Sequence, residues 1–166
     1  MGGVIRDARR EDLPGIQHVV RTTWDYAYRE TIPEEVRKGF VERAYSRASL
    51  ERRIGDDVFL VAIVDEEILG FADFRLASPD EVELAAIYVL PEAQGSGLGT
   101  RLLETGIRGF PSATKITLHV ERENASARHF YERRGFVVDR HHTEILLGHE
   151  LRLVEMTLNV GETPTG

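Results

Sequence analysis

A cluster of three glycines follows an apolar run in the middle of the chain. Gly95, Gly97 and Gly99 stand between an expected strand that ends at Leu90 and an expected helix that begins near Gly97. The first N–H groups of a helix have no partner within the helix and carry a positive partial charge, so glycines there let a phosphate approach without meeting a Cβ atom. The cluster is therefore compatible with phosphate binding, and also with a turn that only reverses the chain.

This glycine cluster differs from two well-known phosphate-binding motifs. It lacks the Gly-Lys-Ser/Thr ending of a Walker loop and the Gly-x-Gly-x-x-Gly spacing of a dinucleotide fingerprint. A second motif, residues 124–136, reads Asn-x-x-Ala-x-x-Phe-Tyr-x-x-x-Gly-Phe and follows an expected strand. The two motifs together are far more specific than the glycines alone.

Composition limits the class of protein that carries these motifs. The 166 residues, of which 42% are hydrophobic and 30% charged, suit one globular domain, which we expect over residues 1–160 with a disordered tail over 161–166. A net charge of -7 argues against binding to nucleic acid or to an anionic membrane surface, because both need basic patches. Without cysteine the chain has no disulfides, thiolate zinc sites or cysteine nucleophiles. No apolar run approaches the ~20 residues of a membrane span, and the first residues lack a signal-peptide core, which favours a cytoplasmic protein.

Apolar periodicity and turn residues predict the elements that must position the motifs. The three apolar segments between residues 57 and 90, separated by short turns, indicate an antiparallel meander. Strands are expected over 4–8, 57–65, 67–77, 81–90 and 115–120, with two more between 136 and 160 that turn near Gly148. Helices are expected over 10–28, 32–54 with a break near Gly39 or Ser46, 99–110 and 124–134. This order predicts an α+β (mixed α/β) protein.

The two motifs together resemble the GNAT superfamily of N-acetyltransferases. The resemblance covers residues 4–160, although its first third depends on element order alone. It implies a mostly antiparallel central sheet flanked by helices, in which two neighbouring parallel strands splay apart to admit the cosubstrate acetyl-CoA. Those strands would be residues 83–89 and 115–120.

The resemblance also implies which residues hold acetyl-CoA. Backbone amides of the glycine loop would hold the pyrophosphate, the end of the preceding strand would pair with the pantetheine arm, and the helix after Asn124 would line the same groove. Asn124 is equally suited to cap that helix, and Phe130 to ordinary packing. The cofactor-binding candidates are Ile87, Tyr88, Val89, Gln94, Gly95, Ser96, Gly97, Leu98, Gly99, Thr100, Asn124, Ser126, Ala127, Phe130 and Tyr131.

Three residues are candidates for the chemistry of acetyl transfer, which needs a neutral amine and a proton for the departing thiolate. Tyr131 resembles the family tyrosine whose hydroxyl reaches the CoA sulfur, and a phenol with a pKa of about 10 keeps its proton at neutral pH. Glu83, eleven positions before Gln94, resembles the glutamate base of several members, and His119 resembles a histidine that acts through water in others. The alternatives are a packed tyrosine, a solvated carboxylate and a structural histidine.

The acceptor site is less clearly marked. Trp24, Asp25, Tyr26 and Tyr28 lie in the segment that borders the acceptor in this family and resemble the corresponding stretch of small-amine acetyltransferases. Aromatic faces with carboxylates suit a cationic amine such as a polyamine, whereas a core tryptophan at a helix end is the alternative. The neighbouring His141 and His142 lack further ligands at metal spacing, so no metal is expected.

Two functional classes remain open at this point. The first is an acetyl-CoA-dependent N-acetyltransferase that acts on a primary amine, with a small cationic amine preferred and a peptide or protein N-terminus as the alternative. The second is a non-catalytic CoA-binding protein of the same fold. Tyr131 and Glu83 together favour the enzyme. A homodimer is compatible with the resemblance, because the C-terminal strands exchange between subunits in some relatives.

Overall fold

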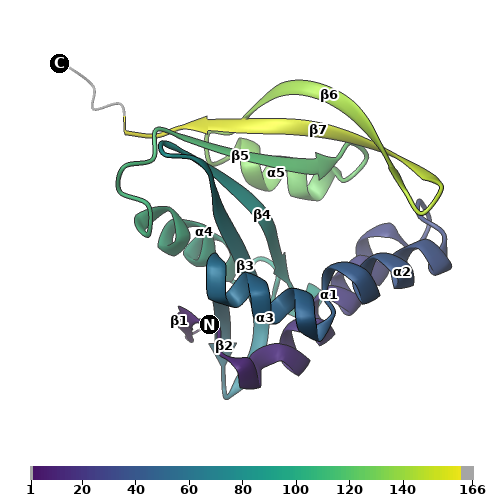
Figure 1. The fold of residues 1–166 in the computed structure, drawn as a ribbon, viewed down its shortest axis with the longest axis horizontal. Coiled ribbons are helices and arrows are strands. Elements are labelled where there is room, and N and C mark those ends of the chain that lie inside the picture. The colour runs from purple at the N-terminus through teal and green to yellow at the C-terminus, as the bar shows by residue number, and fades with distance from the viewer. Residues whose placement is uncertain (1, 162–166) are drawn as a thin grey trace.

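The computed structural model describes residues 2–161 and is built around one seven-stranded sheet with the order β1-β2-β3-β4-β5-β7-β6 (Figure 1). Neighbouring strands are antiparallel except β4 and β5, which are parallel, so the predicted fold class is confirmed. The strands are β1 (Val4–Asp7), β2 (Val58–Val64), β3 (Glu67–Ser78), β4 (Glu81–Val89), β5 (Lys115–Glu121), β6 (Val137–Leu146) and β7 (His149–Asn159). The helices are α1 (Leu13–Tyr28), α2 (Glu34–Ala44), α3 (Arg47–Asp56), α4 (Leu98–Arg108) and α5 (Ala125–Glu132).

The helices form two hydrophobic cores on opposite faces of the sheet. Helices α4 and α5 pack on one face, where Leu98, Leu102 and Tyr131 join residues from β2 to β7. Helices α1, α2 and α3 pack on the other face, over β2, β3 and β4. Ile16 and Val20 of α1 are fully buried there, as expected for residues four apart on one helical face.

Pairing between the two parallel strands is short. β4 and β5 are paired only at Glu81–Lys115, Val82–Ile116 and Glu83–Thr117. Beyond these pairs the strands diverge, while β5 continues alongside β7 (Figure 1). The predicted splay is therefore confirmed, and we call residues 84–89 of β4 and 118–121 of β5 the β4–β5 separation.

A β-bulge marks the start of this separation. In the register with β3, Phe74 lies opposite Leu84 and Asp73 lies opposite Ala86, so Ala85 has no partner. The extra residue reverses which side chains face which core. Leu84 packs with α4 and α5, whereas Ala86 packs with the helices of the other face.

The predicted breaks and turns can now be located. The helix expected over 32–54 breaks at Tyr45 and Ser46, where the Ser46 side chain accepts a hydrogen bond from the N–H of Ser49. Gly39 does not break α2; it leaves room for Leu147 of the β6–β7 turn, with which a Cβ atom would collide. That turn contains Gly148, as predicted. Apart from Gly161, the expected tail lies outside the described residues.

Within the described part of the chain, no helix is both long and apolar enough to span a bilayer.

Candidate active site

The glycine cluster lies at the start of α4 and faces open space. After β4 the chain makes a short 3-10 turn (Pro91–Ala93), and Gly97 then occupies the N-cap position of α4. Gly95 and Gly97 have φ angles of +81° and +90°, and a Cβ atom at either would meet nothing within 4 Å. No side chain caps the first amides of α4. The local geometry is therefore an open anion-binding helix start.

Two polar side chains of the loop form hydrogen bonds with nearby backbone carbonyl groups. The Gln94 side chain donates a hydrogen bond to the carbonyl of Val89 at 3.1 Å, which ties the loop to the end of β4. Ser96 donates from its hydroxyl to the carbonyl of Ala93. The sequence predicted that the backbone amides of this loop bind the cofactor, and the Gln94 and Ser96 side chains hydrogen-bond neighbouring backbone carbonyls.

Helix α5 packs against the first turn of α4. A Cβ atom at Gly99 would lie 3.2 Å from the Phe130 ring, so the glycine permits this close packing. Arg134 stacks over Phe130, 3.7 Å from its ring centre, and donates to the hydroxyl oxygen of Thr100. Sequence reasoning missed Arg134. Its only sequence signal is its place directly before the Gly-Phe end of the second motif.

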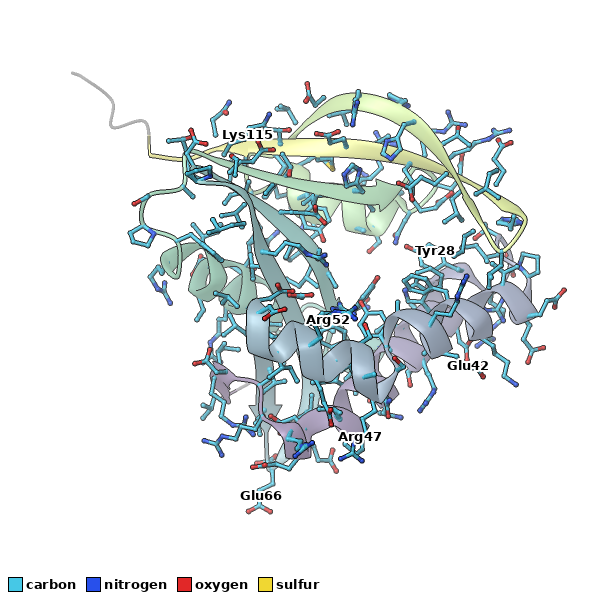
Figure 2. All side chains as sticks on the ribbon, in the orientation of Figure 1. Tyr28, Glu42, Arg47, Arg52, Glu66 and Lys115 are labelled. Carbon is cyan, nitrogen blue, oxygen red and sulfur yellow. The ribbon has the colours of Figure 1, made fainter. Side chains whose placement is uncertain are left out.

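The side-chain amide of Asn124 makes two hydrogen bonds within the protein, one as acceptor and one as donor. Its Oδ1 accepts from the N–H of Ala127 at 3.2 Å and caps α5. Its Nδ2 donates to the hydroxyl of Tyr28 at 3.3 Å, which connects α5 to the end of α1. Figure 2 shows the Tyr28 side chain at the end of α1, directed toward β5 and β7. The contact with Tyr28 could not be read from the sequence, because 96 residues separate the two positions.

Tyr131 lies at the β4–β5 separation with a free hydroxyl. Its ring is only 8% exposed and makes edge contacts with Phe130 and Phe136 at 5.3 and 5.5 Å between ring centres. Burial raises its pKa above the ordinary value, and the nearby hydroxyls of Tyr88 and Tyr28 raise it further. Its hydroxyl forms no hydrogen bond with another described residue. A protonated, unpartnered phenol is thus available as a donor.

The two candidate bases project from the other face of the sheet. Glu83 is half-buried at the last β4–β5 pair, opposite Thr117, and His119 lies two residues further along β5. Val82 and Leu118 pack with α4 and α5, so Glu83 and His119 both point toward the face that α1, α2 and α3 cover.

His119 has a neighbour that sequence reasoning did not assign to it. The exposed His119 ring meets His142 of β6 edge-on, with ring centres 4.8 Å apart. The two strands are not direct neighbours in the sheet, because β7 lies between them. Across residues 2–161, no group of three or more His, Cys, Asp or Glu side chains is placed to hold a metal ion.

The structure does not bring the four acceptor candidates together. Trp24 is buried, stacks on Phe40 at 4.0 Å and donates from Nε1 to the Tyr88 hydroxyl at 3.0 Å. Asp25 pairs with Arg37 at 3.3 Å, while Tyr26 is 64% exposed. Trp24 and Tyr28, four residues apart, meet edge-on with ring centres 4.9 Å apart, but Asp25 and Tyr26 point away from that face, so the four residues do not line one cage.

Behind the bulge of β4 lies a buried charged pair. Asp73, the β3 partner of Ala86, is fully buried and bonds Arg53 at 2.9 Å. Burial and the neighbouring Asp57 carboxyl raise the pKa of Asp73 to about 7, against the opposing charge of Arg53. This pair anchors α3 to the sheet directly behind the bulge.

Two surface hollows lie beside the site rather than within it. One, of about 430 Å³, is formed at the beginnings of α1 and α3. The other, of about 300 Å³, is lined by residues that include His141, His142 and Arg152. Of these three, His142 is the one whose ring meets His119. The candidate site is therefore defined by the β4–β5 separation and its polar groups, not by these hollows.

Comparison with known proteins agrees with this geometry. The model of the acetyltransferase (GNAT) family matches residues 19–136. The chain belongs to the GNAT family. A relative named "Probable N-acetyltransferase" from Mycobacterium tuberculosis is 39% identical over 104 residues, which are 61% of this chain and 58% of that protein. Mycothiol acetyltransferase from Streptomyces griseus is 37% identical over 81 residues, 47% of this chain and 26% of that protein.

A solved GNAT structure matches nearly the whole chain. The PaiA N-acetyltransferase from Thermoplasma acidophilum, in complex with coenzyme A, aligns with a TM-score of 0.82 and 26% identity. The alignment covers 96% of this chain and 99% of that one. By contrast, this chain spans 58% and 26% of the two sequence relatives described above.

The double role of Asn124 leads to a prediction about stability. Asn124→Ala removes both hydrogen bonds and should lower the free energy of unfolding by about 1–2 kcal/mol in urea titrations. Asn124→Asp keeps an acceptor at the N-cap but loses the donor to Tyr28, so it should retain most of the stability. Equal losses in the two variants would contradict the capping role.

Proposed function

We propose that the protein is an acetyl-CoA-dependent N-acetyltransferase that acts on a primary amine. The observation that carries this proposal is the free hydroxyl of Tyr131 at the β4–β5 separation, on the same face of the sheet as the open start of α4. Membership of the GNAT family and the coenzyme A bound to the Thermoplasma relative support it.

The donor would lie on the α4 and α5 side of the sheet. The uncapped amides after Gly97 would hold its pyrophosphate, and the unpaired edge of β4 at Ile87 and Val89 would bond the pantetheine arm as an added strand does. Beyond Glu83 the backbone groups of β4 that face β5 have no partner there. Ala127 and Phe130 of α5 would line the same path.

The acceptor would approach from the opposite face, where Glu83 and His119 project. A lysine-like amine with a pKa of about 10.4 must lose its proton at a cost of about 4.6 kcal/mol at pH 7, whereas an α-amine with a pKa of about 8 costs about 1.4. Glu83, through a water molecule and with help from His119, would take that proton. Tyr131 would give its proton to the departing thiolate.

A small amine that arrives as an ammonium ion is the preferred acceptor. The net charge of -7 and the carboxylates of Glu83 and Glu121, both on the acceptor face, support a cation. Polyamines are the most strongly charged members of this class. A peptide N-terminus is the alternative acceptor, and a non-catalytic CoA-binding protein is the alternative function.

Substitution at Gly97 tests the donor site. Gly97→Asp places a carboxylate beside the helix start and a side chain at a φ of +90°. Calorimetric affinity for acetyl-CoA should fall more than about tenfold, because the carboxylate repels the pyrophosphate. Gly148→Asp, at the β6–β7 turn with a similar positive φ, is the matched control for backbone strain. Unchanged affinity in folded Gly97→Asp would rule out this site.

Removal of the Tyr131 hydroxyl tests the chemistry. An assay of CoA thiol release over a panel of amines and peptides has no thiol background, because the chain has no cysteine. Tyr131→Phe should lower kcat roughly tenfold to a thousandfold, with little change in acetyl-CoA affinity. A wild-type kcat in this variant would leave Tyr131 as a packing residue only. No thiol release with any amine would favour the non-catalytic alternative.

The charge of the acceptor can be tested with matched amines. A polyamine should have a higher kcat/KM than a neutral-tailed amine of similar length, and added salt should raise its KM because salt screens the attraction. Glu121→Gln should reduce this preference. Equal kcat/KM for both amines in the wild type would contradict a cation-selective site and favour a peptide acceptor.

A further inference from the structure

Two hydroxyl groups beside the β4–β5 separation have their oxygen atoms bound by N–H donors. The indole Nε1 of Trp24 donates to the hydroxyl of Tyr88 at 3.0 Å. The amide Nδ2 of Asn124 donates to the hydroxyl of Tyr28 at 3.3 Å. These bonds join α1 to β4 and α1 to α5, so each hydroxyl is held in a defined place by two elements.

Both hydroxyls still have a proton to donate. A phenol carries one O–H donor besides its lone pairs, and the bound N–H groups occupy lone pairs. Over residues 2–161, no hydrogen bond receives the proton of Tyr88 or of Tyr28, and the neighbouring Tyr45 hydroxyl acts on Tyr88 as a further donor. Because an unpaired donor away from bulk water is unfavourable, such a group calls for a partner from outside the protein.

These donors lie next to the residue expected to serve the reacting thiol. Burial is the main cause that raises the pKa of Tyr131. The hydroxyls of Tyr88 and Tyr28 are close enough to raise that pKa further. Tyr88 projects from β4 beyond the bulge, on the same face as Glu83. It is half-buried, whereas Tyr45 of the same aromatic cluster is only 3% exposed. Of the two donors, Tyr88 is the more exposed residue, since Tyr28 is only 9% exposed.

The surroundings of the two hydroxyls suit an uncharged oxygen. Burial raises the pKa of both Tyr88 and Tyr28, so both stay neutral donors. The carboxylate of Glu121 lies near enough to Tyr28 to raise its pKa further. An anionic oxygen on the acceptor would be repelled by Glu121, whereas a hydroxyl, ether or amide oxygen would not.

Resting on the N-acetyltransferase function, we propose that Tyr88 determines acceptor specificity: its hydroxyl, oriented by Trp24, donates a hydrogen bond to an uncharged oxygen that the acceptor carries close to its amine. Amino alcohols, amino ethers and aminoacyl amides have such an oxygen. Simple polyamines do not, so among small cationic amines those that also carry such an oxygen are the preferred acceptors. Tyr28 is a second donor beside the same position.

The test compares two acceptors of equal length that differ in one atom. In 2-methoxyethylamine an ether oxygen replaces a methylene of butylamine. The ratio of their kcat/KM values is measured by thiol release for the wild type and for Tyr88→Phe. A site that donates to the oxygen rejects the analogue that lacks it, so the ratio should fall about tenfold or more in Tyr88→Phe. Dividing the two ratios cancels the different basicities of the amines.

Two further variants separate specificity from structure. Tyr45→Phe removes a hydroxyl that interacts with the Tyr88 oxygen but leaves the Tyr88 proton in place, so it should lower the ratio much less than Tyr88→Phe does. Trp24→Phe keeps an aromatic ring but no N–H group, so the ratio should lie between those of the wild type and Tyr88→Phe. Acetyl-CoA affinity, measured by calorimetry, should be unchanged in all three variants.

The outcomes distinguish this inference from the function on which it rests. An unchanged ratio in Tyr88→Phe overturns the inference, including the case where kcat falls equally for both amines because Tyr88 serves the thioester oxygen instead. Failure of 2-methoxyethylamine to react, while an oxygen-free amine reacts, also overturns it. If no amine or peptide reacts with the wild type, the proposed function itself fails.

Discussion

A β-bulge leaves one residue of strand β4 without a partner in β3. The pairing of β4 with β5 ends beside this bulge. Ala85 has no partner in β3, and Glu83–Thr117 is the last pair between β4 and β5. Beyond that point the edges of two interior strands face each other without hydrogen bonds. Because unpaired backbone groups within a protein are unfavourable, this edge needs water or a ligand to satisfy it. An extended molecule can pair with the backbone groups of this edge as an added strand does.

The same separation connects the two faces of the sheet. Tyr131 belongs to the core beneath α4 and α5, whereas Tyr88 packs with the core beneath α1, α2 and α3. The Tyr88 hydroxyl is nevertheless near enough to Tyr131 to raise its pKa, which is possible because the strands diverge between them. The separation thus lies between two separately packed hydrophobic cores, one on each face of the sheet.

Polar contacts between distant segments hold the parts of the site in place. The Trp24–Tyr88 and Asn124–Tyr28 bonds fix the end of α1 against β4 and α5, and Arg53–Asp73 fixes α3 behind the bulge. Helix α1 therefore positions two hydroxyls: that of its own Tyr28 and, through Trp24, that of Tyr88. Its aromatic residues act through hydrogen bonds and packing rather than as an open aromatic cage.

Local sequence determined the helices and strands and the position of the glycine loop. Apolar spacing, the turn residues near Gly148 and the N-cap residues Ser46 and Asn124 act within a few neighbouring positions, so helices, strands and most turns could be predicted. The glycine loop could be placed at the start of α4 for the same reason: positive φ angles and a free helix start are local properties.

Only the tertiary structure decided how the predicted acceptor residues are arranged and which distant elements are connected. Gly39 was expected to break a helix. Instead, a glycine at this position leaves room for Leu147, which lies 108 positions later in the sequence. Trp24, Asp25 and Tyr26 looked like one group because they are adjacent in sequence, yet helical geometry points them in different directions. The partners of Tyr28, Tyr88 and Thr100 come from segments 34 to 96 residues away. Such contacts depend on how the cores pack, which no local pattern of residues encodes.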